Sequence, residues 1–335
     1  GADTFDNAAL ALLRPEGPDG PVAALPSDGW KQLLVYRGDW FDARSLAPPV
    51  DFTGVISGAA GIARPEALVS GLVVPTEDGL LSTQRIFEQF AVANGCELVA
   101  PSGEITLLDP ACLGALDFYR GLVNRYSPSD IQTDTSALNA YLEGRTGIII
   151  GSPALLPILA GLEPDNLPRC PECDEPDYLA RQTRVVTTIG GSGPAAVAST
   201  YAQLSVMGFT STANVPAATA FASYWFEAGY LRWLSLNPAQ KAPLRLGTAA
   251  DPLRFVSAWL ALPLTAGGWT LADLYGEALA TELVSNLGAT NRWGLAEGQG
   301  AIVSAIVRDR IFSVLLQEML SGYQTTSRTL LDAYN

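Results

Sequence analysis

The chain of 335 residues contains no histidine, and only 16% of its residues are charged. Without histidine, Ser-His-Asp and Cys-His catalytic groups and histidine-ligated metal sites are excluded. No apolar run reaches membrane-spanning length, since Gly151, Pro153 and Pro157 interrupt the apolar stretch of residues 148–162. Hydrophobic residues make up 48% of the chain, so it can bury large cores and is not a disordered protein.

Basic residues are few: 20 Lys and Arg stand against 34 Asp and Glu, which gives a net charge of −14. With no basic stripe to meet phosphates, nucleic acids and anionic membrane surfaces are disfavoured as partners. The acidity is typical of a well-solvated surface, and an acidic substrate site is the alternative. A chain of this length exceeds what one core usually supports, so two lobes are expected.

Residues 109–153 are the most informative stretch. Asp109 is expected to cap a helix that begins at Pro110, and apolar residues at helical spacing continue it to Tyr126. A short helix around residues 138–142 follows and ends at Gly144. Residues 147–151 are short, β-branched and apolar, as in a buried strand.

This order of helix, short helix and strand resembles the carbohydrate-binding extracellular solute-binding proteins of ABC importers, the group that includes maltose-binding protein. Further matches follow the same order along nearly the whole chain. They are Ala24-Leu25-Pro26 before Val35–Phe41, then Leu46–Pro49, a helix Ser82–Ala93 ending at Asn94-Gly95, a helix Val215–Leu234 capped by Asn214, Pro243-Leu244-Arg245, and the closing segment Phe312–Tyr334. Residues 180–189 are predicted as a strand, and residues 300–320 as helical.

The resemblance implies an α/β fold of the type II periplasmic-binding-protein kind, helix-rich, with two lobes joined by a hinge. The first lobe would comprise residues 1–36 and 204–290, and the second residues 37–203 and 291–335. Family members carry a longer βαβ-rich opening of the first lobe before the counterpart of Pro26. This sequence is therefore expected to be a fragment, to have its missing half supplied elsewhere, or to have lost it.

The four cysteines form two local pairs. Cys170-Pro-Glu-Cys173 is half of a zinc site, and no second pair stands at suitable spacing. Cys96 and Cys112 flank a predicted hairpin of residues 97–99 and 105–107. In an exported protein two local disulfides fit this arrangement better than a metal, and four structural thiols in a reduced cytosolic protein are the alternative.

By alignment with the family, ligand-binding residues are expected where strands end and helices begin. The candidates are Trp30, Trp40, Gln84, Arg85, Asn94, Ser152, Ser205, Met207, Arg245, Arg308 and Asp309. Each has a structural alternative: a solvated helix face, a turn cap, a buried core position or an exposed ion pair. The family's Gly-Pro-Trp is Gly151-Ser152-Pro153 here, and the Arg308-Asp309 position is polar rather than aromatic, so the sugar assignment is weakened.

The resemblance implies that the protein captures a sugar or related polar solute by hinge closure and delivers it to the transmembrane subunits of an ABC permease. It would do so without catalysis, cofactor, metal or nucleic acid, in the periplasm or at the cell surface, and would contact a membrane only through a lipid anchor. Two alternatives belong to other classes. One is a glycoside hydrolase that uses paired carboxylates, for which Glu88, Glu297 and Asp309 are available, and the other is a non-binding scaffold relative.

Overall fold

The computed structural model describes residues 4–15, 17, 19–265, 268–295 and 297–334, and these residues form two compact units. Unit 1 comprises the described parts of residues 1–31, 152–157 and 202–290, and unit 2 those of residues 32–151, 158–201 and 291–335. The chain passes between the units at five points, two of which flank the short segment of residues 152–157. We refer to the other three, 31/32, 201/202 and 290/291, as the three crossings. The sequence analysis placed the limits of two hinged lobes at 36/37 and 203/204, and those limits stay a prediction.

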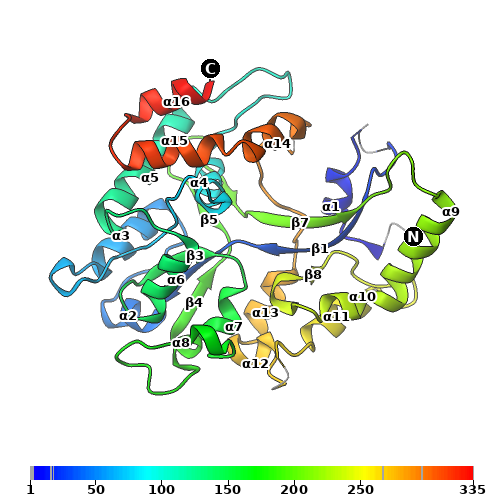
Figure 1. The fold of residues 1–335 in the computed structure, drawn as a ribbon, viewed down its shortest axis with the longest axis horizontal. Helices are drawn as coiled ribbons and strands as arrows, with labels where there is room; N and C mark the ends of the chain where they lie inside the picture. Colours follow the sequence, from blue (N-terminus) through cyan, green and yellow to red (C-terminus); the bar gives the residue numbers. More distant parts are fainter. Residues whose placement is uncertain (1–3, 16, 18, 266–267, 296, 335) are drawn as a thin grey trace. The chain divides into compact units, whose positions relative to one another are not determined.

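Unit 1 is built around a sheet in the order β7–β1–β8. Its strands are β1 (Leu25–Lys31), β7 (Ala202–Met207) and β8 (Ala242–Pro243). Both pairings are antiparallel, and Figure 1 shows β7 alongside β1. The helices of this unit are α1 (Asn7–Leu12), α9 (Val215–Tyr224), α10 (Tyr230–Leu234), α11 (Arg254–Leu260), α12 (Leu271–Tyr275) and α13 (Glu277–Val284).

Aromatic side chains fill the interior of unit 1. Tyr230 and Phe255 meet edge to face with ring centroids 5.0 Å apart, and Phe5 and Phe226 do so at 5.3 Å. The predicted helix of residues 215–234 is present, but a π-helical turn (Trp225–Gly229) divides it into α9 and α10. Asn214 caps α9 as expected, because its side-chain oxygen accepts from the backbone N–H of Ala217 at 3.2 Å.

Unit 2 contains a second antiparallel sheet in the order β3–β2–β4, with β2 (Leu33–Arg37), β3 (Ile148–Gly151) and β4 (Thr183–Val186). The strand predicted at residues 147–151 is thus confirmed as β3, whose three isoleucines are all buried. A two-stranded sheet pairs β5 (Ile189–Gly190) with β6 (Ala198–Ser199). The prediction of one strand over residues 180–189 is partly wrong, because residues 178–182 form helix α8 (Tyr178–Gln182).

The helices of unit 2 are α2 (Gly38–Ala43), α3 (Phe52–Ile62), α4 (Leu81–Ala93), α5 (Pro110–Tyr126), α6 (Asp134–Leu142), α8, α14 (Gly300–Arg308), α15 (Ile311–Leu320) and α16 (Thr326–Tyr334), while α7 (Leu155–Leu159) begins in unit 1 and ends in unit 2. Most helices of unit 2 pack around one large hydrophobic core, while Ala137 and Ala140 of α6 form a separate small cluster with Val73. Ten of the thirteen residues of α4 are buried, since α5 and α15 both pack against it (Figure 1).

Local sequence signals explain most of these helices. Helix α5 begins at Pro110 as predicted, but the side chain of Asp109 makes no capping hydrogen bond. Helix α6 has a capping box in which Thr133 and Ser136 satisfy each other's backbone N–H groups. The predicted helix of residues 300–320 is broken, because Arg310 adopts a left-handed backbone conformation with φ = 58°. Among the described residues, no helix is both long and apolar enough to cross a membrane.

Candidate functional site

One face of the unit 1 sheet carries polar and aromatic side chains. In the β1–β7 ladder, Asp28 lies opposite Ser205, and Trp30 lies opposite Gln203. Alternate residues of a strand point to the same face, so these four side chains share one face of the sheet. We call this group the β1 face. The exposure of its side chains varies: Asp28 is 1% exposed, Trp30 and Gln203 are half-buried, and Ser205 is exposed.

Trp233, in α10, and Lys241, directly before β8, extend the β1 face around Asp28. The indole N–H of Trp233 donates to Asp28 Oδ2 at 2.6 Å, and the Lys241 ammonium nitrogen lies 3.8 Å from Asp28 Oδ1. The same nitrogen lies 3.4 Å from the centre of the Trp233 ring, which is a cation–π contact. A buried carboxylate, an ammonium group and two indole rings, those of Trp30 and Trp233, are therefore held on one side of this sheet.

The β1 face also contains hydrogen-bonding capacity that the protein leaves unused. Gln203 Oε1 is buried and has no hydrogen-bond partner among the described residues. The indole Nε1 of Trp225, whose ring lies 4.8 Å from that of Trp233, is likewise buried without one in the described part of the chain. Buried polar atoms are normally satisfied, so unpaired ones beside an aromatic group favour a site completed by a bound molecule or water.

The other predicted site residues of unit 1 lie elsewhere. Met207, at the end of β7, lines a small apolar pocket with Leu25, Gly208 and Phe209. Ser152 Oγ accepts from Gln240 Nε2 at 2.8 Å. Arg245 is 7% exposed, pairs with Glu227 at 2.7 Å and lies over the ring of Phe255, so its guanidinium serves packing within the unit.

In unit 2, the predicted residues Gln84 and Arg85 are neighbours in the first half of α4. Gln84 is 1% exposed, and its Oε1 is buried without a hydrogen-bond partner among the described residues. Arg85 is half-buried, and its carbonyl oxygen accepts from Gln32 Nε2 at 3.4 Å. The predicted role of these two residues in ligand binding stays a prediction.

Asn94, at the end of α4, holds the glycine-rich loop of residues 190–194. Its Oδ1 accepts from the backbone N–H groups of Gly193 at 3.1 Å and Ser192 at 3.3 Å, and its Nδ2 donates to the carbonyl of Ala111 at 2.8 Å. A Cβ on Gly191 would lie 2.2 Å from the carbonyl oxygen of Ala93, so only glycine permits this approach. The Asn94 side chain is thus occupied by contacts within unit 2.

The three remaining predicted residues have packing or surface roles. Trp40 is 8% exposed, and the guanidinium of Arg37 lies 4.3 Å from its ring centre. Arg308 and Asp309 form an exposed ion pair at 2.8 Å, which was one of the alternatives for these two residues. The structure therefore assigns all three to local contacts, and their predicted roles in ligand binding stay predictions.

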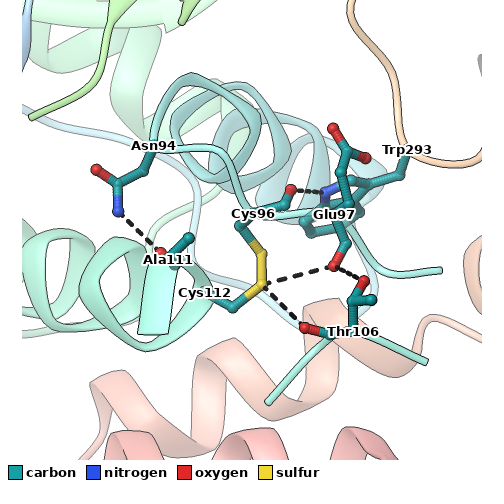
Figure 2. The surroundings of a disulfide bond; sticks show 7 residues. All are labelled: Asn94, Cys96, Glu97, Thr106, Ala111, Cys112 and Trp293. Atoms are coloured by element: carbon teal, nitrogen blue, oxygen red, sulfur yellow. Dashed lines mark hydrogen bonds between the residues drawn. A yellow bond between two sulfur atoms is a disulfide. The ribbon is translucent and has the colours of Figure 1, made fainter. Parts of the chain in front are cut away.

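Both local cysteine pairs are disulfide-bonded, and no cysteine among the described residues is free. The Cys96–Cys112 bond joins the end of α4 to the first turn of α5 (Figure 2). Around it, the Trp293 indole N–H donates to the carbonyl of Cys96 at 2.9 Å, and Thr106 Oγ1 donates to the carbonyl of Glu97 at 2.9 Å. No group of three or more acidic or cysteine side chains in the described ranges is arranged to hold a metal ion.

Beside this disulfide, Glu97 has an unusual carboxyl group. Burial, followed by repulsion from the carboxylates of Glu297 and Glu88, raises the pKa of Glu97 to about 7 from its ordinary value of 4.5. Each of the three carboxyl groups has one oxygen that is buried without a partner among the described residues. The native state therefore binds the Glu97 proton more tightly than the unfolded state does.

We expect the stability of the protein to fall as the pH rises from about 4.5 to about 7, since the unfolded chain releases this proton first. Glu97→Gln removes the charge and keeps the shape, so it is expected to stabilise the protein at pH 8 by about 1 kcal/mol, a value reduced for the partial exposure of the side chain. Urea unfolding at pH 4.5 and pH 8 measures the effect. An equal or lower stability of the variant at pH 8 would show that Glu97 ionises without cost.

The sequence analysis did not single out four residues of the β1 face: Asp28, Gln203, Trp233 and Lys241. Asp28 lies two residues from the predicted Trp30 on the same strand, so strand alternation alone would have paired them. Trp233 lies 205 residues from Asp28 in the sequence, and no local pattern indicates their hydrogen bond. Gln203 follows from its register opposite Trp30, which only the sheet pairing shows.

The fold is that of the solute-binding proteins of ABC transporters, of the type II periplasmic-binding class, and it confirms the predicted fold class and resemblance. No family model matches the chain. Among curated proteins it is similar to the one named "Putative ABC transporter periplasmic-binding protein YcjN" of Escherichia coli K12, at 28% identity over 171 residues. That match covers 50% of this chain and 38% of the relative, so it spans well under half of the relative's length.

Solved structures with the same fold cover almost the whole chain. A solute-binding protein of Thermotoga lettingae bound to α-D-tagatose is 17% identical, with a TM-score of 0.63, covering 94% of this chain and 71% of its own. Maltose-bound MalE3 of T. maritima is 14% identical, with a TM-score of 0.67 and coverages of 98% and 74%. A solute-binding protein of Agrobacterium vitis bound to D-mannitol is 16% identical, with a TM-score of 0.60 and coverages of 98% and 76%.

Proposed function

We propose that this chain is the substrate-binding component of an ABC transporter, and that it captures a sugar or sugar alcohol outside the cytoplasm for delivery to a permease. The fold supports this function, because proteins of the same fold have been solved with tagatose, maltose and mannitol bound. The curated relative is described as periplasmic, which supports an extracytoplasmic location. A lipid anchor stays a prediction.

The observation that carries the proposal is the polar and aromatic group on the β1 face. Carbohydrate sites combine aromatic rings, which stack on the apolar faces of the sugar, with carboxylate, amide and ammonium groups that bond its hydroxyls. Trp30, Gln203, Asp28 and Lys241 provide all of these within unit 1. In this account Asp28 and Lys241 orient the hydroxyls, and Trp30 supplies the stacking surface.

The mechanism requires binding and no chemistry. The two units would act as the lobes of a hinged receptor, and a ligand that binds the closed form more tightly shifts the population toward it. The hydrolase alternative receives no support from the curated relative, which is named a periplasmic-binding protein, or from the solute-binding proteins of Thermotoga lettingae and Agrobacterium vitis. Glu88, its first candidate carboxylate, is held by Arg292 at 2.6 Å, and Asp309 is paired on the surface with Arg308.

Thermal-shift screening with mono-, di- and oligosaccharides and sugar alcohols tests the proposal, since a ligand of the native state raises the melting temperature. For a ligand found in this way, Trp30→Ala is expected to weaken binding by about 10- to 100-fold through the loss of stacking. Trp269→Ala is the matched control, because this tryptophan of unit 1 is 53% exposed and lies outside the β1 face. Equal affinities of the two variants would contradict the assignment of the β1 face.

A further inference from the structure

The three crossings at 31/32, 201/202 and 290/291 lead into unit 2 beside one helix, α4. The first crossing brings in Gln32, the second leaves at Tyr201, and the third brings in Asn291 and Arg292. The three segments bond to one another within unit 2. The backbone N–H of Gln32 donates to the carbonyl of Tyr201 at 2.8 Å, and that of Asn291 donates to the carbonyl of Thr200 at 2.8 Å.

Gln89 of α4 binds two of these segments through its buried amide. Its Oε1 accepts from Gln32 Nε2 at 2.8 Å, and its Nε2 lies 3.3 Å from the carbonyl oxygen of Ser199 and 3.2 Å from that of Thr187. Gln89 is 1% exposed and Gln32 is 3% exposed, so water does not compete for these bonds. One side chain thus joins the first crossing to the chain that leads into the second.

Glu88, the neighbour of Gln89 on α4, binds the third crossing. Its Oε1 accepts from Arg292 Nε at 2.6 Å and from the backbone N–H of Trp293 at 3.1 Å. The guanidinium of Arg292 in turn lies 4.1 Å from the ring centre of Tyr201, at the second crossing. Adjacent residues of one buried helix therefore fix all three segments within two residues of the points where they leave unit 1.

A helix interior rarely carries two buried polar residues side by side, because each must find partners in a low-dielectric environment. Here those partners are the crossing segments themselves. A hinge operates where a few residues at the ends of elements absorb a change in backbone angles, and the segments on either side must be held rigidly for the motion to be reproducible. Helix α4 provides such a fixed end on the unit 2 side.

We propose that Glu88 and Gln89 are positioning residues that hold the crossing segments to α4 and thereby set the equilibrium between open and closed arrangements of the two units. This inference rests on the proposed function, since it concerns the hinge of a solute-binding receptor. According to this proposal, the crossing segments bend only outside the points at which the Gln89 amide and the Glu88 carboxylate bind them to α4. Loosening either one allows the crossings to take more than one path.

The test measures the distance between the units in ligand-free protein. Spin labels on S129C in unit 2 and S257C in unit 1, both exposed positions, report this distance by pulsed electron resonance. Gln89→Met keeps the side-chain volume and removes the amide. We expect it to broaden or shift the distance distribution and to change the apparent affinity for the sugar identified by thermal shift by at least about threefold.

Gln132→Met is the matched control, because Gln132 is a buried glutamine of unit 2, 8% exposed, that bonds to Asp130 and Ser136 away from the crossings. It should lower the melting temperature without altering the distance distribution. If Gln89→Met fails to fold, Gln32→Met removes the partner amide and is measured in the same way.

Distance distributions equal to that of the wild type in the folded variants would overturn the proposal. Absence of any sugar binding by the wild type would overturn the proposed function instead, because the ligand-free distances are measured independently of it.

Discussion

Arg292→Met is expected to destabilise the protein by about 3–5 kcal/mol, because it leaves a buried carboxylate without its counter-charge. Glu88 is 0% exposed, and the guanidinium of Arg292 forms a charge-assisted bond with its carboxylate at 2.6 Å. The backbone N–H of Trp293 is a weaker substitute, since it carries no charge. Urea denaturation of the variant and of the wild type measures the difference.

The control separates the buried charge from the loss of packing. In the double variant Glu88→Gln with Arg292→Met, residue 88 is neutral and still able to accept from Trp293 N–H. We expect it to recover more than half of the lost stability, because replacing both members of a buried pair is far less costly than removing one. A double variant as unstable as the single one would indicate that the aliphatic stem of Arg292 and its contact with Tyr201 carry the effect.

Replacing both cysteines of the Cys96–Cys112 bond by serine is expected to lower the stability by about 3 kcal/mol, since the bond closes a loop with a sequence separation of 16. The Cys170–Cys173 bond has a separation of only 3, so its removal is expected to cost about 2 kcal/mol on the same model. Thermal unfolding of the two double-serine variants compares them. A larger loss for Cys170–Cys173 would contradict the loop-length argument.

The first of these bonds also fixes the geometry around α4. It ties the end of this helix to the start of α5, close to Asn94, which holds the glycine-rich loop, and to Trp293, which follows the third crossing (Figure 2). We therefore expect the loss of the bond to loosen the native packing of these neighbours, in addition to increasing the conformational entropy of the unfolded chain. Serine variants that melt without cooperativity in unit 2 would be consistent with that expectation.

Local signals in the sequence were sufficient for the elements that depend on near neighbours. The start of α5 at Pro110, the capping of α9 by Asn214 and the buried strand β3 were predicted correctly because each depends on a few consecutive residues. The breaks at the π-helical turn of residues 225–229 and at Arg310 were missed. Their apolar periodicity continues across the break, and only tertiary packing decides the backbone path.

The candidate site was predicted less completely for the same reason. Trp30 and Ser205 were among the predicted residues and lie on the β1 face, while Trp233 and Lys241 contact Asp28 from about 200 residues away, where no spacing rule applies. Arg245 was predicted as a ligand-binding residue from its place after the preceding helix, and in the structure it contacts Glu227 and Phe255 in the interior of unit 1. A polar residue that matches a family position is therefore not distinguishable by sequence from one that supports packing.

Small-angle X-ray scattering of the wild-type protein, with and without the sugar or sugar alcohol identified by thermal shift, tests the central claim most directly. The account predicts that a saturating ligand decreases the radius of gyration, as the two units close on it, and that mass spectrometry of the released ligand finds it chemically unchanged. A radius of gyration that stays constant at saturation, or a ligand recovered in cleaved or modified form, would contradict capture by closure.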